Sequence, residues 1–105
     1  MKIRAKNREQ TVDMTLPVTD MDMQYYMKRI GIENVMPVCC ISEVRDEPPY
    51  FGFLKGQTVN MDELNFFARR LDGMTEYEKR VVGVYSSETG IREMKQLINL
   101  TYSLQ

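Results

Sequence analysis

Apolar and polar residues alternate over residues 11–16, which read Thr-Val-Asp-Met-Thr-Leu. A period of two predicts a half-buried strand, because successive strand side chains point to opposite faces. Pro17 ends this strand. The apolar stretches 37–44 and 50–54 predict a central strand and its hairpin partner, with a proline-containing turn between them. These segments together predict a small antiparallel sheet of about three strands.

Helical spacing appears between the first two predicted strands. Thr19 with Asp22 three residues later is typical of a helix start, and Gly31 suits a helix end. Between them, apolar residues recur at i, i+3, i+4 and i+7: Met23, Tyr26, Met27 and Ile30. The pattern predicts a helix over residues 19–30.

The second half of the chain predicts a cluster of three helices. Asn60 is a suitable N-cap for a helix that Gly73 ends, and its buried stripe comprises Met61, Leu64, Phe67, Ala68 and Leu71. A capping-box sequence over 75–78 predicts a helix to about Tyr85, and residues 91–104 predict the last one. We therefore expect one α+β domain over residues 1–105.

Residues 1–10 form the most basic part of the chain. They contain Lys2, Arg4, Lys6 and Arg8, with few large apolar side chains. This composition leaves two alternatives, a loose basic arm or an edge strand.

The composition offers little for catalysis. There is no histidine, so the commonest general base and metal ligand is missing. Cys39 and Cys40 are adjacent, a spacing that suits neither a redox pair nor a zinc site, and we expect one to face the core. No calcium loop or phosphate-binding glycine loop occurs. We expect a binding protein that is not an enzyme, with no catalytic residues, cofactor or metal.

The sequence also bears on localisation. The basic start is not followed by the apolar region of a signal peptide, and no apolar stretch is long enough to span a membrane. Two cysteines alone are typical of a reducing compartment. These features predict a cytoplasmic protein.

Charge is segregated along the chain, although the formal net charge is only −1 at pH 7. Residues 9–78 contain thirteen acidic and six basic residues, whereas both ends are basic. Carboxylates in the first turn of a helix stabilise the helix dipole and need no other role. Alternatively, carboxylates spread over one face would imitate the phosphates of DNA.

Three segments resemble ArdA-like antirestriction proteins of plasmids and conjugative elements. Residues 61–71, Met-Asp-Glu-Leu-Asn-Phe-Phe-Ala-Arg-Arg-Leu, resemble that family's DELNYLAxRL segment. Residues 94–104, Met-Lys-Gln-Leu-Ile-Asn-Leu-Thr-Tyr-Ser-Leu, resemble the LINLTYNL ending of its Gram-positive relatives. Leu16-Pro17 followed by Ile30-Gly31 is similar to the family's LPM…RIG opening. The resemblance covers roughly two thirds of the chain, in the same order.

The resemblance implies a small α+β protein from a mobile genetic element such as a conjugative transposon. Family members inhibit type I restriction-modification enzymes by copying the shape and charge of B-form DNA, and they form dimers. It therefore implies a protein partner of this class, a homodimer and an acidic, DNA-mimicking surface. The surface that we expect comprises Asp20, Asp22, Glu43, Asp46, Glu47, Asp62, Glu63, Asp72 and Glu76.

The alternative is a nucleic-acid-binding or dimerisation module of a conjugative element, without antirestriction activity. A nucleic-acid binder would use the basic N-terminal residues together with Lys79, Arg80, Arg92 and Lys95. The aromatic residues Tyr25, Tyr26, Tyr50, Phe51 and Phe53 would stack on bases, or else form the core. A single contiguous negative face favours mimicry, and interleaved charges favour the module.

Polar residues in the two family-like helices have simpler interpretations. We expect Asn65 and Asn99 to form hydrogen bonds within the domain. Of the adjacent Arg69 and Arg70, we expect one to pair with a neighbouring carboxylate such as that of Asp72 or Glu63.

Overall fold

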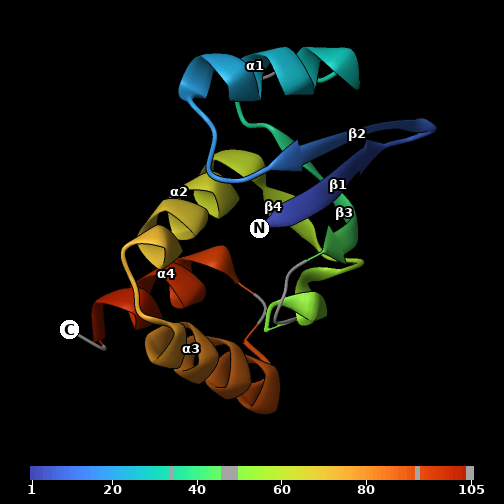
Figure 1. Ribbon diagram of the computed structural model, residues 1–105. Helices are drawn as coiled ribbons and strands as arrows, with labels where there is room; N and C mark the ends of the chain where they lie inside the picture. The colour runs from blue at the N-terminus through green and yellow to red at the C-terminus, as the bar shows by residue number, and fades with distance from the viewer. Residues whose placement is uncertain (34, 46–49, 92, 104–105) are drawn as a thin grey trace.

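The computed structural model describes residues 1–33, 35–45, 50–91 and 93–103. It is an α+β protein with a four-stranded antiparallel sheet and four α-helices (Figure 1). The strands are β1 (Lys2–Asn7), β2 (Gln10–Thr15), β3 (Val38–Arg45) and β4 (Thr58–Asn60). The helices are α1 (Asp20–Arg29), α2 (Met61–Asp72), α3 (Glu76–Thr89) and α4 (Met94–Ser103), and Gly52–Leu54 forms a short 3₁₀ helix, η1.

The strand order is β2-β1-β3-β4, so the basic N-terminal segment lies inside the sheet. Both alternatives predicted for residues 1–10, a loose arm and an edge strand, are wrong. β1 pairs with β2 on one side and with β3 on the other. Its Ile3 and Ala5 are buried, and they alternate with Lys2, Arg4 and Lys6. Two apolar residues at a period of two are thus enough for an interior strand when the charged residues share the other face.

The predicted strand over residues 50–54 is also wrong. This segment contains the 3₁₀ turn η1. The strand that follows β3 along the chain and pairs with it is instead the short β4. Phe51 and Leu54, three residues apart, are both 1% exposed, as the three-residue period of a 3₁₀ turn requires. The ring of Phe51 lies edge-on to that of Phe67 in α2, with centroids 5.4 Å apart. Burial of these side chains against α2 therefore outweighs their preference for a strand.

The helix starts agree with the sequence predictions. Thr19 Oγ1 accepts a hydrogen bond from the backbone N–H of Asp22, and Asn60 Oδ1 accepts from two backbone N–H groups of α2. Thr75 and Glu78 form the complete capping box of α3. Each cap satisfies backbone donors that the first helical turn leaves free.

Two helix boundaries differ from those predicted. α3 continues to Thr89, past the expected end near Tyr85, because Ser86 is buried on its inner face and Gly90 provides the left-handed C-cap, with φ of 73°. α4 begins at Met94 and not at Ile91.

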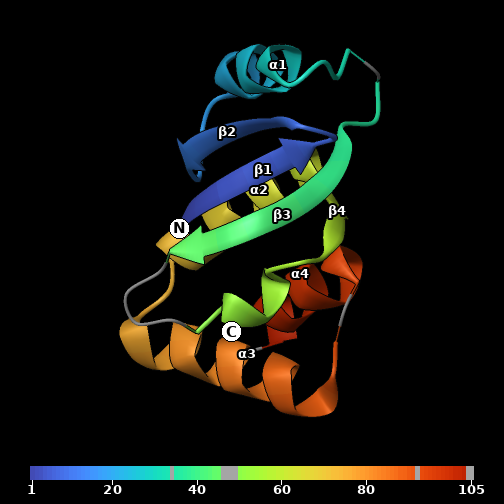
Figure 2. The same cartoon turned by 90° about the vertical axis from the view of Figure 1, so that its right-hand side faces the viewer.

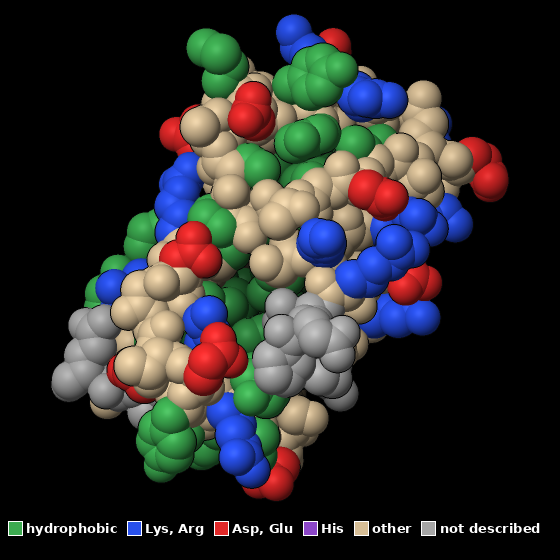
Figure 3. All heavy atoms as spheres, in the orientation of Figure 1, with side chains coloured by type: hydrophobic (Ala, Val, Ile, Leu, Met, Phe, Trp, Pro, Cys, Tyr) green, Lys and Arg blue, Asp and Glu red, His purple; other side chains and the backbone are tan. Residues whose placement is uncertain are grey.

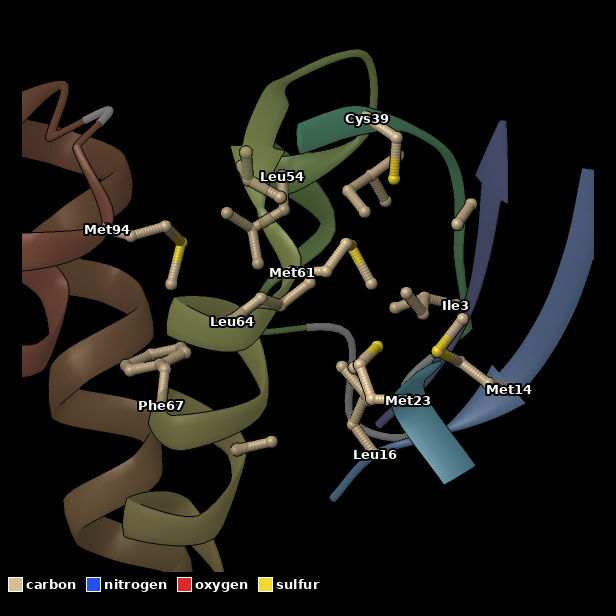
Figure 4. Packing of buried hydrophobic residues seen from close by; sticks show 14 of the residues in the cluster. Ile3, Met14, Leu16, Met23, Cys39, Leu54, Met61, Leu64, Phe67 and Met94 are labelled. Carbon is tan, nitrogen blue, oxygen red and sulfur yellow. The ribbon is translucent and has the colours of Figure 1, made fainter. Parts of the chain in front are cut away.

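The core lies between the sheet and the helices, with α2 at its centre. In Figure 4, Met61 of α2 extends toward Ile3 and Met14 of the sheet, while Phe67 and Leu64 lie nearer to Met94 of α4. All five residues of the stripe predicted for α2 are buried, as are Val12, Met14 and Leu16 of the predicted β2 stripe. α2 therefore joins the sheet to the α3–α4 pair (Figure 1).

Helix α2 also fixes the link between β2 and α1. The side chain of Asn65 is 2% exposed, accepts a hydrogen bond from the N–H of Val18 and donates one to its carbonyl oxygen, both at 2.9 Å. Arg69, one turn further along α2, donates to the same carbonyl oxygen at 2.7 Å. The predicted internal role of Asn65 is confirmed.

The prediction for Asn99 is wrong, and the prediction for the two arginines is confirmed only in part. Asn99 is exposed, and its side chain forms no hydrogen bond with any described residue. Arg69 pairs with a carboxylate, as predicted, but it is that of Asp20 in α1 and not that of a sequence neighbour such as Asp72 or Glu63. Arg70 donates to Thr101 of α4 and lies over the Tyr102 ring, 3.8 Å from its centroid.

Cys39 and Cys40 lie on opposite faces of β3, as their adjacent positions predict. Cys39 is 5% exposed, and burial raises the pKa of its thiol to about 11. Cys40 is half-buried and lies opposite Lys6 of β1 in the strand pairing.

We expect Cys40 to react with an aromatic disulfide reagent at least about 100-fold faster than Cys39 at pH 8, because only thiolates attack and a buried thiol is rarely ionised. The measurement is the time course of thiol release in the wild type and in Cys40→Ser. Rapid release of two equivalents from the native wild type would contradict the placement of Cys39.

Candidate functional site

The nine acidic residues expected to form one surface lie in separate parts of the fold. Asp20, Asp22, Asp62 and Glu63 occupy the first turns of α1 and α2. Asp72 and Glu76 lie where α2 ends and α3 begins. Glu43 is on β3, opposite Arg4 on the face of the sheet that points away from α2. Asp46 and Glu47 are outside the described residues. Of these acids, the structure brings Asp20 of α1 and Asp62 of α2 to one groove.

Several of these acids have basic neighbours. Asp20 Oδ1 is 3.4 Å from Nη2 of Arg69, and Glu43 Oε1 is 3.6 Å from Nζ of Lys55. Glu76 Oε1 lies 3.5 Å from Nζ of Lys79. Figure 3 accordingly shows acidic and basic side chains interleaved over one face of the molecule. On that face the charges do not form the contiguous negative surface that extended mimicry of DNA favours.

One groove brings three carboxylates together, including that of Asp20, which is paired with Arg69. It has a volume of about 720 Å³ and lies between α1, residues 32–33 and 35–37, and the start of α2. Three carboxylates line it, those of Asp20, Glu33 and Asp62, with Lys28 as the one basic lining residue among those described. Its apolar lining consists of Met23, Met27, Ile32, Val35 and Pro37. We call this feature the acidic groove.

Sequence reasoning found only part of the acidic groove. Asp20 and Asp62 were expected at a binding surface, but Glu33 was not, because it falls in an irregular segment with no periodic pattern. Val35 and Met36, which follow Glu33 closely in the chain, are 97% and 66% exposed. Exposed apolar side chains are typical of an interaction site, but the sequence does not show that these two are exposed. Only folding shows that these residues lie next to α1.

Basic residues gather on the face of the sheet that points away from α2. Lys2, Arg4 and Lys6 of β1 share this face with Arg45 of β3, which pairs with Lys2. Within the described residues no helix lies in front of β2, β1 and β3 in the view of Figure 2, so this face is open. A hollow of about 400 Å³ on it is lined by Lys2, Arg4 and Arg45, together with Asp13 and Glu43. We call this surface the basic sheet face.

The basic residues expected to join the N-terminal ones do not reach this face. Lys79 and Arg80 are on α3 and Lys95 is on α4, in the helical layer beyond α2 (Figure 1). Arg92 is outside the described residues.

The aromatic residues are mainly part of the core. Phe51 is buried, and Tyr26, Tyr50 and Phe53 are half-buried against the hydrophobic cluster. Tyr25 is 57% exposed and lies edge-on to Tyr26. The five do not form the exposed stacking surface that the nucleic-acid interpretation requires.

Two carboxyl groups, those of Asp13 and Glu78, have pKa values lowered by hydrogen bonds within the fold. A hydrogen bond from Arg4 lowers the pKa of Asp13, across the β1–β2 ladder. A hydrogen bond from the backbone N–H of Thr75 lowers the pKa of Glu78 in the α3 capping box.

A metal-binding cluster and a membrane-spanning helix are both missing from the described residues, 1–33, 35–45, 50–91 and 93–103. No group of three or more cysteine or acidic residues there is arranged to hold a metal ion. In the same part of the chain, no helix combines the length and the apolar character that crossing a bilayer requires.

Comparison of the chain with family models, with curated proteins and with solved structures finds no match. The structure defines the class, an α+β protein, and the interpretation of its function rests on the two charged surfaces.

Proposed function

We propose that the chain is a non-catalytic accessory protein of the ArdA-like antirestriction type, which binds a type I restriction-modification enzyme through the acidic groove. The observation that carries the proposal is the convergence of Asp20, Glu33 and Asp62 around one apolar groove. The resemblance of the α2 and α4 sequences to that family supplies the class of partner. Its action belongs in the cytoplasm, where restriction enzymes cut DNA, and the dimer implied by the resemblance stays a prediction.

The proposed mechanism is local electrostatic competition with DNA. An enzyme that binds duplex DNA presents basic side chains to the phosphates, and a carboxylate cluster attracts the same side chains. The groove brings three carboxylates together, although Asp20 is also paired with Arg69 and Lys28 lies among the lining residues. We therefore expect inhibition to weaken steeply with salt, since the screening length is only about 10 Å at 0.1 M.

The apolar lining adds a contribution that salt does not remove. Val35 is 97% exposed and is the apolar lining side chain that a partner reaches, whereas Met23 and Met27 of α1 belong to the core. A basic partner segment that carries one apolar side chain would bury that side chain here while its charges meet the carboxylates. The groove therefore differs from a purely acidic helix face in offering both carboxylates and apolar contacts to a partner.

The test is inhibition of DNA cleavage by a purified type I restriction enzyme across a salt series. The groove variant is Asp20→Asn with Glu33→Gln and Asp62→Asn. The control variant, Asp72→Asn with Glu76→Gln and Glu88→Gln, removes the same charge from exposed positions elsewhere. We expect the groove variant to lose at least about tenfold in potency and the control to stay within twofold.

Three outcomes would contradict the proposal. Absence of inhibition by micromolar wild-type protein at low salt removes the proposed activity. Equal losses in the two variants assign inhibition to total charge rather than to the groove. Full potency of the groove variant, with its fold verified by circular dichroism, removes the groove from the mechanism.

A further inference from the structure

The open side of the sheet carries an excess of positive charge that the proposed function does not use. Among the described residues of β1, β2 and β3, the basic side chains on this face are Lys2, Arg4, Lys6 and Arg45 and the acidic ones are Asp13 and Glu43, with Lys55 reaching Glu43 from the segment after η1. The two acids are each paired with a base, Asp13 with Arg4 at 2.7 Å and Glu43 with Lys55 at 3.6 Å. Lys2, Lys6 and Arg45 form no ion pair with any described residue.

The placement of Lys2 and Arg45 is unfavourable for the isolated fold. They are directly opposite each other on neighbouring strands, and like charges in that position repel. Both are exposed and line the 400 Å³ hollow, in which Arg4 is a third cation. A bound anion at this place would remove the repulsion.

The geometry points to an extended anion. Alternate residues of β1 are about 6.7 Å apart, so Lys2, Arg4 and Lys6 form a row of cations along one strand. The three strands β2, β1 and β3 form a surface about 10 Å wide, which suits a single polynucleotide strand rather than a double helix. Tyr26 also lines the hollow, but its side chain is half-buried against the core, so the contacts of this face come from its cations.

We propose that the basic sheet face binds single-stranded nucleic acid through its phosphates. Lys2, Lys6 and Arg45 are the contacts, and the hollow between Lys2 and Arg45 holds one phosphate group. Binding has little sequence preference, because phosphate contacts carry no base information. The acidic groove is on another side of the molecule, so the proposal does not depend on the proposed function.

The test is fluorescence anisotropy of a labelled twelve-residue oligothymidylate titrated with the full chain over a salt series. We expect the triple variant Lys2→Ala, Lys6→Ala, Arg45→Ala to bind at least about tenfold more weakly than the wild type. The logarithmic salt slope of the wild type should be steeper by about two units, because each single-strand phosphate contact contributes about 0.7.

The control variant removes three exposed cations from the helices, Lys28→Ala, Arg80→Ala and Lys95→Ala. Its net charge equals that of the triple variant, and we expect its affinity to stay within twofold of wild type. A second variant, Arg45→Glu, places opposite charges across β1 and β3. We expect it to weaken binding while leaving the melting temperature unchanged or higher, which a merely structural role of Arg45 would not produce.

Four results would overturn the proposal. They are no anisotropy change with 100 micromolar protein at low salt, equal weakening by the control variant, tighter binding of the corresponding duplex, and equal competition by polyaspartate. Failure here is distinguishable from failure of the proposed function, because the triple variant retains the acidic groove and is expected to inhibit restriction as the wild type does.

Discussion

Replacement of Asn65 by alanine is expected to lower the free energy of unfolding by about 3 kcal/mol, because two hydrogen bonds in a buried position are lost. The amide of Asn65 satisfies both backbone groups of Val18, 47 residues earlier in the chain. Without it, the N–H of Val18 has no described partner, and its carbonyl oxygen keeps only Arg69. For a domain of this size the change corresponds to a fall in melting temperature of roughly 15 °C.

Thermal unfolding followed by circular dichroism measures this effect. The matched control is Asn99→Ala, in the other family-like helix, where the side chain is exposed and the expected change is within about 0.5 kcal/mol. Asn65→Asp, which retains the acceptor for the Val18 N–H but not the donor, should be intermediate. Similar melting temperatures for Asn65→Ala and Asn99→Ala would show that the link between α2 and Val18 contributes no stability.

Replacement of Gly83 by valine is expected to be similarly destabilising, by about 3 kcal/mol, because α3 approaches Tyr50 too closely for a side chain. A Cβ atom at Gly83 would lie 2.6 Å from Tyr50 Cβ and 2.8 Å from the Tyr50 carbonyl oxygen. Since one of these atoms is backbone, α3 or the segment at Tyr50 would have to move.

Alanine at this position separates packing from helix propensity. Gly83→Ala gains about 1 kcal/mol of propensity, so its net loss should be smaller than that of the valine variant. The control is Gly52→Ala, where nothing lies within 4 Å of the added Cβ. Chemical denaturation gives the three free energies, and a Gly83→Val protein as stable as the wild type would contradict the close approach.

Much of the fold follows from local pattern. The period of two at Val12, Met14 and Leu16 and the helical stripe of α2 both define faces that are buried in the structure. The caps at Thr19, Asn60 and Thr75 set the helix starts, because each satisfies donors within its own helix. These features depend on residues no more than a few positions apart.

The parts that were predicted wrongly depend on distant contacts. The strand at residues 2–7 looked basic rather than apolar, and its place in the sheet is set by pairing with β3, some forty residues away. Phe51 has a high strand preference, but its contact with Phe67 decides its conformation.

The candidate site was likewise predicted only in those parts that depend on local sequence. Asp20 and Asp62 were identified as acids at helix starts, but Glu33, the groove and the pairing of Asp20 with Arg69 arise only from the tertiary arrangement. The four basic residues near the N-terminus were identified, whereas Arg45 joins three of them through strand pairing. A one-dimensional charge map therefore finds the charged segments but not the surfaces that they form.

The central claim, that this protein acts by competing with DNA for a binding surface on an enzyme, is tested most directly by displacement. Fluorescently labelled duplex DNA is bound to a type I restriction-modification enzyme at low salt, and the protein is then titrated in. The account predicts that the wild type displaces the duplex, that displacement weakens as salt increases, and that the groove variant displaces it at least about tenfold less effectively. Retention of all the DNA by the enzyme at micromolar wild-type protein would contradict it.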